Sequence, residues 1–213
     1  MKTKIYLIRH GESQANEKGL FLGHGDLDLT ERGKAQAQKA AEYLKNVPVD
    51  KIYSSDLLRA YHTAETTANF VGIPIIKRKE LREINAGKWD FEPFSMLPIK
   101  YPESYNIWLN DIGSACPDGG ESVADVLKRT VTEILRISKE NEGKTVFVFT
   151  HATTIRAFAT YCVSKSIKGI QLRPYPANAS VTYVEYENGE FRLVEYSNDS
   201  FMGEIATALP SNV

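Results

Sequence analysis

The sequence predicts an α/β fold in three layers: a mostly parallel central sheet with helices on both faces, and a C-terminal hairpin. Three observations predict it. Short apolar, β-prone runs alternate with longer segments whose apolar residues have helical spacing. The last two β-prone runs, 181–186 and 191–196, flank Asn188-Gly189, a strong hairpin signal. The chain has 213 residues, and about 100 to 200 residues are usual for one domain.

The first part of the chain predicts three strands and two helices. The apolar run 5–8 is typical of a buried strand. Thr30 is a suitable N-cap for a helix that continues to residue 45, because its hydroxyl can accept a free backbone N–H. A strand at 51–53 precedes Ser54-Ser55-Asp56, which offers caps for a helix that ends near Val71, before a glycine. A third strand follows at 73–76.

The second part predicts the central strand and its covering helices. Residues 90–117 are irregular and aromatic, with one short helix at 104–109, and are interpreted as a cap-like insertion in a single domain, 1–213. The segment 121–142 has apolar residues at helical spacing, so one face is buried. The unbroken apolar run 146–149 is expected of a central parallel strand, and a helix follows at 152–163.

Composition excludes several classes of protein. The 26 basic and 27 acidic residues give a formal net charge of −1, so nothing favours a nucleic acid or an anionic membrane as partner. No apolar run reaches the roughly 18 residues of a membrane span, and the N-terminus lacks a secretory pattern. Two distant cysteines, Cys116 and Cys162, do not form a disulfide scaffold. A cytoplasmic location is therefore expected.

Two histidines share an unusual position. His10 follows the strand at 5–8, and His151 follows the strand at 146–149. Ligands of open α/β sheets bind outside the carboxyl ends of the strands. If the two strands are neighbours, both imidazoles meet in one crevice. His24, in a Gly-His-Gly loop, and His62, inside a helix, lack this setting.

Several chemistries do not fit the pattern. Closely spaced zinc ligands and the G-x-S-x-G turn of serine hydrolases are absent. Gly143-Lys144-Thr145 is not a P-loop, since Ser138 stands at the first glycine position and a strand follows. What remains is a histidine that acts on a phosphoryl group, since neutral imidazole is a good nucleophile near pH 7.

A phosphoryl site also needs cations and a proton donor. Arg9 precedes His10, and Arg59 lies in the first turns of a helix at the same sheet edge, where the helix N-terminus also favours an anion. Glu83, after the third strand, is the natural proton donor for the leaving oxygen. Alone, such a histidine is more often structural and such an arginine a surface charge. Three other glutamates compete for the donor role: Glu12, Glu80 and Glu121.

These residues lie within a series of motifs that together resemble the histidine phosphatase superfamily, in its phosphoglycerate mutase-like branch. The matches occur in the family's order along nearly the whole chain: Arg9-His10-Gly11-Glu12-Ser13 with Asn16, residues 29–37, residues 54–60 with Thr63-Ala64, Leu81-Arg82-Glu83 with Gly87 and Trp89, Gly119-Gly120-Glu121-Ser122, Thr150-His151 with Ile155-Arg156-Ala157, and Asn178-Ala179-Ser180-Val181.

The resemblance implies a phosphoglycerate mutase-like fold and a role for each site residue. His10 would be the phosphorylated nucleophile, and Glu83 would protonate the leaving group and then activate water. Arg9, Arg59 and His151 would hold the phosphoryl group, His151 partly as a charged donor. Asn16 would contact a phosphate oxygen, and the other residues expected to contact substrate are Leu22, Gly23 and Ala152. No metal or organic cofactor is implied.

The chain departs from the family pattern at several positions. Relatives often have a glycine where this chain has Ala152, and only the backbone N–H is needed there. Relatives often carry a polar residue before Gly23, where this chain has Leu22, so one polar contact to substrate is missing. Mutases carry an Arg-Tyr-Gly-type stretch after the catalytic glutamate, whereas this chain has Ile-Asn-Ala-Gly-Lys-Trp at 84–89.

The composition of the cap-like insertion favours a phosphatase over a mutase. Residues 90–117 contain one base and four acids, and a mutase must also hold a second phosphate. Their aromatic residues suit an uncharged or apolar substrate body, although they could equally form an ordinary cluster under a long loop: Phe91, Phe94, Tyr101, Tyr105 and Trp108. The sequence therefore predicts a metal-independent phosphomonoesterase for a small phosphorylated metabolite.

Two alternative functions stay open: a mutase-type phosphoryl transferase, and a catalytically silent module that binds a phosphorylated ligand. The expected partner is a small phosphomonoester, with no nucleic acid and no membrane. A homodimer is an option that the sequence leaves open.

Overall fold

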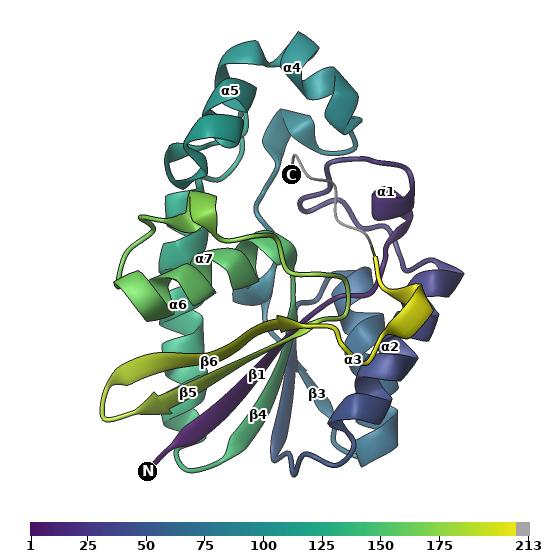
Figure 1. Cartoon of the computed structure of the whole chain (residues 1–213), viewed down its shortest axis with the longest axis vertical. Helices are drawn as coiled ribbons and strands as arrows, with labels where there is room; N and C mark the ends of the chain where they lie inside the picture. Colours follow the sequence, from purple (N-terminus) through teal and green to yellow (C-terminus); the bar gives the residue numbers. More distant parts are fainter. Residues whose placement is uncertain (208–213) are drawn as a thin grey trace.

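The computed structural model describes residues 1–207 and is built around a six-stranded sheet (Figure 1). The strand order is β3-β2-β4-β1-β5-β6. The first four strands are parallel, and β5 and β6 are antiparallel, as predicted. The strands are β1 (Thr3–Arg9), β2 (Lys51–Ser54), β3 (Ile75–Lys77), β4 (Thr145–Thr150), β5 (Val181–Glu187) and β6 (Glu190–Asn198).

Helices cover both faces of the sheet, which confirms the three-layer prediction. Apolar residues of α2 and α3 pack on one face, and those of α6 and α7 pack on the other (Figure 1). The α-helices are α1 (Gln14–Glu17), α2 (Glu31–Leu44), α3 (Leu58–Val71), α4 (Leu97–Lys100), α5 (Pro102–Asn110), α6 (Val123–Glu140) and α7 (Ala152–Ser164). Short 3-10 helices lie at Lys79–Leu81, Gly87–Trp89, Phe94–Met96, Ile112–Ser114, Ile170–Leu172 and Gly203–Ile205.

Most helix ends follow the sequence signals, with one exception. The Thr30 hydroxyl accepts the Gly33 N–H at the start of α2, as predicted. The expected caps at residues 54–56 are wrong, because α3 starts after Leu57, which has no capping side chain. The Leu58 N–H instead donates to Asp26 Oδ1 at 2.7 Å, from a loop distant in sequence.

The segment 90–117 forms the end of the molecule toward which the parallel strands point (Figure 1). It contains α4 and α5, so it is more helical than predicted. Its apolar side chains join a core cluster with residues of α6 and α7. The segment is also tied to the loop 19–22: the Phe21 N–H donates to Glu92 O, the Phe91 N–H donates to Phe21 O, and Leu20 forms a β-bridge with Pro93.

Among residues 1–207, no helix is both long and apolar enough to span a bilayer.

Candidate active site

The two strand-end histidines lie side by side at the carboxyl edge of the sheet. Strands β1 and β4 are parallel neighbours, with Arg9 opposite Thr150, so the next residue of each strand is a histidine. The ring centroids of His10 and His151 are 5.2 Å apart, and both side chains are buried. The geometric expectation from the sequence therefore holds.

Hydrogen bonding fixes the tautomer of His10. Its Nδ1 lies 2.7 Å from Gly11 O, and a carbonyl oxygen can only accept, so Nδ1 carries the proton. The lone pair is then on Nε2. Burial lowers the pKa of His10 well below its usual value, and the nearby charges of Arg59 and Arg9 lower it further. At neutral pH His10 is thus a neutral imidazole whose Nε2 is a nucleophilic nitrogen.

The imidazole of His151 is hydrogen-bonded to Ser55, which follows the neighbouring strand β2. Its Nε2 lies 2.8 Å from Ser55 Oγ, whereas its Nδ1 is buried and has no partner in the described part of the chain. Burial and the charge of Arg59 lower the pKa of His151 well below its usual value. Its imidazole is therefore neutral at neutral pH, and a nearby anion would favour its charged form.

Two buried arginines supply positive charge to the same site. Arg9 Nη1 donates to Pro176 O at 2.6 Å, and Arg59 donates to Gly23 O and Gly25 O at 2.8 and 2.9 Å. Within the described chain, all hydrogen bonds of both guanidinium groups end on backbone carbonyls. Burial lowers the pKa of each to about 10, so both stay charged at neutral pH. Two buried cations without carboxylate partners form an environment that favours an anion.

Glu83 lies at the N-terminus of α7. Its Oε1 accepts the Ile84 N–H at 2.8 Å, and its Oε2 accepts the Thr153 N–H at 3.2 Å. Thr153 is the second residue of α7, so Glu83 accepts one of the free backbone donors at the start of this helix. Both bonds hold the carboxyl group at the wall of the cavity that His10 lines.

A cavity of about 210 Å³ borders four of these groups, whereas His151 is not among its lining residues and lies behind it beside His10. His10, Arg9, Arg59 and Glu83 line it. Of the residues predicted to contact substrate, three also line it: Asn16, Leu22 and Ala152. The rest of the wall is mainly apolar and includes Phe21, Ile84, Phe94, Trp108 and Tyr175.

Gly23, the fourth residue expected to contact substrate, contacts Arg59 through its backbone. It is not among the lining residues, but its carbonyl oxygen accepts from Arg59. Its N–H and that of Gly25 donate to the two carboxylate oxygens of Asp90, both at 2.8 Å. Gly23 thus helps to fix Arg59 through the backbone, and Asp90 in turn fixes the loop.

The competing glutamates are engaged elsewhere. Glu12 lines the cavity, but its carboxylate accepts from Thr30 Oγ1 at 2.8 Å and pairs with Arg32 at 3.5 Å. Glu121 pairs with Arg129, and neither Glu121 nor Glu80 lines the cavity. Among residues 1–207, no group of three His, Cys, Asp or Glu side chains has an arrangement that could hold a metal ion.

Sequence reasoning missed the role of five residues of this site. Ser55 was assigned to a helix cap but contacts His151, and Tyr175 and Thr153 carried no signal at all. Asp90 was counted only as a charge. Asn178, which was part of a motif without a role, donates to His10 O and to Asn16 Oδ1, both at 3.2 Å.

Comparison with known proteins assigns the family. The family model described as "Histidine phosphatase superfamily (branch 1)" matches residues 5–199. This chain belongs to that superfamily. The match confirms the resemblance seen in the motifs, and it extends from within β1 to the end of the C-terminal hairpin.

Three similar proteins illustrate the relationship. Phosphoserine phosphatase 1 of Hydrogenobacter thermophilus is 32% identical over 95% of each chain. The adenosylcobalamin/alpha-ribazole phosphatase of Escherichia coli is 35% identical over 70% of this chain and 73% of its own. The solved structure of Bacillus stearothermophilus YhfR has a TM-score of 0.89 at 28% identity, covering 94% of this chain and 99% of the other. The predicted activity class and the phosphoglycerate mutase-like fold are thereby confirmed.

Proposed function

We propose that this chain hydrolyses a small phosphomonoester through a phosphohistidine on His10. One observation carries this proposal: a neutral imidazole and two buried arginines line the same cavity. The Nε2 lone pair of that imidazole is free. An imidazole whose pKa is lowered remains a nucleophile at the pH where a phosphomonoester is an anion. Membership of a family with named phosphatases supports the same activity.

The reaction has two steps. In the first, His10 Nε2 attacks phosphorus, the P–O ester bond breaks, and the leaving oxygen takes the proton of Glu83. In the second, the Glu83 carboxylate takes a proton from water, the water oxygen attacks phosphorus, and the P–N bond breaks to release inorganic phosphate. Arg9, Arg59 and His151 stabilise the charge on the equatorial oxygens in both steps. Asn16 uses its amide oxygen within the protein, so its Nδ2 donors are available to a phosphate oxygen.

The cavity favours a substrate with one phosphate and an apolar body. Arg9 and Arg59 are the cations that line it, and the first phosphate engages both. The remaining wall is mainly aromatic and aliphatic, with Leu22 where a polar side chain is common in the family. A second phosphate would be buried there without a counter-charge, which disfavours the mutase reaction. A cytoplasmic location and a homodimer remain predictions.

Phosphate release across a panel of phosphomonoesters tests the function. We expect turnover that persists with a chelator, and a labelled enzyme intermediate that is acid-labile and base-stable. His10→Ala should abolish both, while the matched control His62→Ala, which removes a histidine on α3 bonded to Asp28, should keep them. Unchanged turnover in His10→Ala would exclude His10 as the nucleophile. Exchange of phosphoglycerate isomers faster than phosphate release, with a bisphosphate primer, would support a mutase instead.

A further inference from the structure

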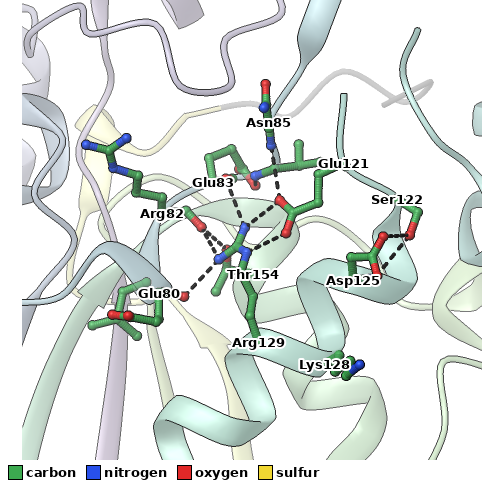
Figure 2. A network of polar contacts seen from close by, with 12 residues as sticks. Glu80, Arg82, Glu83, Asn85, Glu121, Ser122, Asp125, Lys128, Arg129 and Thr154 are labelled. Atoms are coloured by element: carbon green, nitrogen blue, oxygen red, sulfur yellow. Dashed lines mark hydrogen bonds and ion pairs between the residues drawn. The ribbon is translucent and has the colours of Figure 1, made fainter. Parts of the chain in front are cut away.

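One side chain outside the cavity forms hydrogen bonds along the backbone of residues 80–83, the segment that contains Glu83. Arg129, on α6, lies under residues 80–85 and is partly buried (Figure 2). Its guanidinium group donates to the carbonyl oxygens of Glu80 at 2.8 Å, Arg82 at 2.7 Å and Glu83 at 2.9 Å. It also forms a two-bond pair with the Glu121 carboxylate at 2.6 and 3.0 Å.

These bonds use the full donor capacity of an arginine. A guanidinium group has five N–H donors in a fixed plane, and each of the five bonds to Arg129 takes one. The Glu121 carboxylate continues the network, because its Oε2 accepts the Asn85 N–H at 3.2 Å. The Glu121 N–H also donates to Asn85 O at 2.9 Å. Residues before and after Glu83 are therefore both fixed to one ion pair.

The network holds the backbone of Glu83 while its carboxyl group faces the cavity. Glu83 O accepts from Arg129 and also from His24 Nε2, at 3.0 Å. Its carboxylate bonds the amides of Ile84 and Thr153, as described above. The preceding carbonyl oxygen, Arg82 O, accepts a further hydrogen bond from Thr154 Oγ1 at 2.9 Å (Figure 2). Side chains of both α6 and α7 therefore hydrogen-bond to the backbone beside Glu83. A small shift of the turn would move the carboxyl group relative to His10.

We propose that Arg129 and Glu121 form a positioning pair that sets the reach of Glu83 to the leaving oxygen. This inference rests on the proposed role of Glu83 as the proton donor. Neither member of the pair lines the cavity, so each acts through Glu83 and not on the substrate. Lysine cannot replace Arg129, because an ammonium group has three donors and no planar fork that could bond three carbonyls and a carboxylate together.

Leaving-group dependence separates a positioning role from a structural one. p-Nitrophenolate leaves with little protonation, whereas the benzyl alkoxide needs a proton from the enzyme. Both substrates have an aromatic body and one phosphate, so binding in the cavity is matched. The ratio kcat/KM reports the steps up to release of the alcohol, and thus the step in which Glu83 acts as an acid.

The test compares four variants on both substrates: Arg129→Lys, Glu121→Gln, Glu83→Gln and Arg136→Gln. Arg136 is the matched control, since it is an ion-paired arginine on the same helix whose bonds are to Glu133 and Glu140. We expect Arg129→Lys and Glu121→Gln to lower kcat/KM for benzyl phosphate about 10- to 100-fold and for p-nitrophenyl phosphate less than about 3-fold. Glu83→Gln should show the same selectivity with a larger loss, and Arg136→Gln should show neither.

Each outcome is decisive. Suppose that Glu83→Gln lowers kcat/KM more for benzyl phosphate than for p-nitrophenyl phosphate. The positioning role is then overturned if Arg129→Lys and Glu121→Gln lower kcat/KM equally for both substrates, or not at all. No selectivity in Glu83→Gln overturns the donor role in the proposed function itself. Glu121→Gln keeps the three carbonyl bonds of Arg129 and an acceptor for Asn85, so it decides the test if Arg129→Lys unfolds.

Discussion

Removal of the Arg59 charge should lower activity by two to three orders of magnitude with little loss of stability. The guanidinium group is about 1% exposed and bonds only the carbonyls of Gly23 and Gly25. Burial lowers its pKa from the usual arginine value to about 10, which corresponds to a cost of about 3 kcal/mol for the buried cation at neutral pH. Arg59→Met relieves this cost, while two carbonyls that lose their partner cost about 1 kcal/mol each.

The expected result for Arg59→Met is therefore a free energy of unfolding within about 1.5 kcal/mol of the wild-type value. Removal of one partner of a buried ion pair would instead cost about 3 to 5 kcal/mol. Loss of a donor to the transferring phosphoryl group should lower kcat/KM about 100- to 1,000-fold.

Urea unfolding with and without phosphate, together with steady-state kinetics, measures both effects. Phosphate at 100 times its Kd should stabilise the wild type by about 2.7 kcal/mol and the variant far less. A loss of more than about 3 kcal/mol in Arg59→Met without phosphate would refute the account of an unpaired cation. Equal stabilisation of both proteins by phosphate would refute the anion site.

Three further predictions concern pH, strain and the cavity wall. Folding lowers the pKa values of His10 and His151, so below pH 6.5 these two residues gain protons in the unfolded chain but not in the folded one. The free energy of unfolding should therefore fall by about 1 kcal/mol per histidine from pH 7 to 5.5. In urea titrations, His10→Gln should reduce this fall. Phe91 has a φ of 66°, so Phe91→Gly should be about 1 kcal/mol more stable than Phe91→Ala in thermal unfolding, and equal values would contradict the strain. Phe94→Ala should raise KM for benzyl phosphate about 10-fold and leave KM for a small alkyl phosphate unchanged, as initial rates would show.

Local patterns predicted most of the fold because each strand and helix carries its own periodicity. The run 146–149 predicted the central strand, and the Asn-Gly turn predicted the hairpin that the structure contains. The start of α3 was not predictable in this way, because its first N–H is capped by Asp26 from a distant loop. The four-residue helix α1 has no room for a period, so its capping box of Ser13 and Asn16 passed unnoticed.

The candidate site likewise has some features that local sequence predicts and others that depend on contacts between distant segments. The strand-end rule was sufficient to bring His10 and His151 together, because it depends only on which strands are neighbours. The contacts of Ser55 with His151 and of Asp90 with the loop around Gly23 depend on the folded course of separate segments. Such contacts cannot be predicted from the local sequence. The single-domain assignment with a cap-like insertion stays a prediction.

The joining of the loop 19–22 to the segment 90–117 has a consequence for engineering. Phe21 lies against the rings of Trp89, Phe94 and Trp108, with centroids 5.2 to 5.4 Å apart. Its backbone N–H donates to Glu92 O, and its carbonyl oxygen accepts the Phe91 N–H. Specificity is therefore not carried by an exchangeable module. A chimera that imports only residues 90–117 from a relative would lose the partner surface of Phe21, so both segments must be transplanted together.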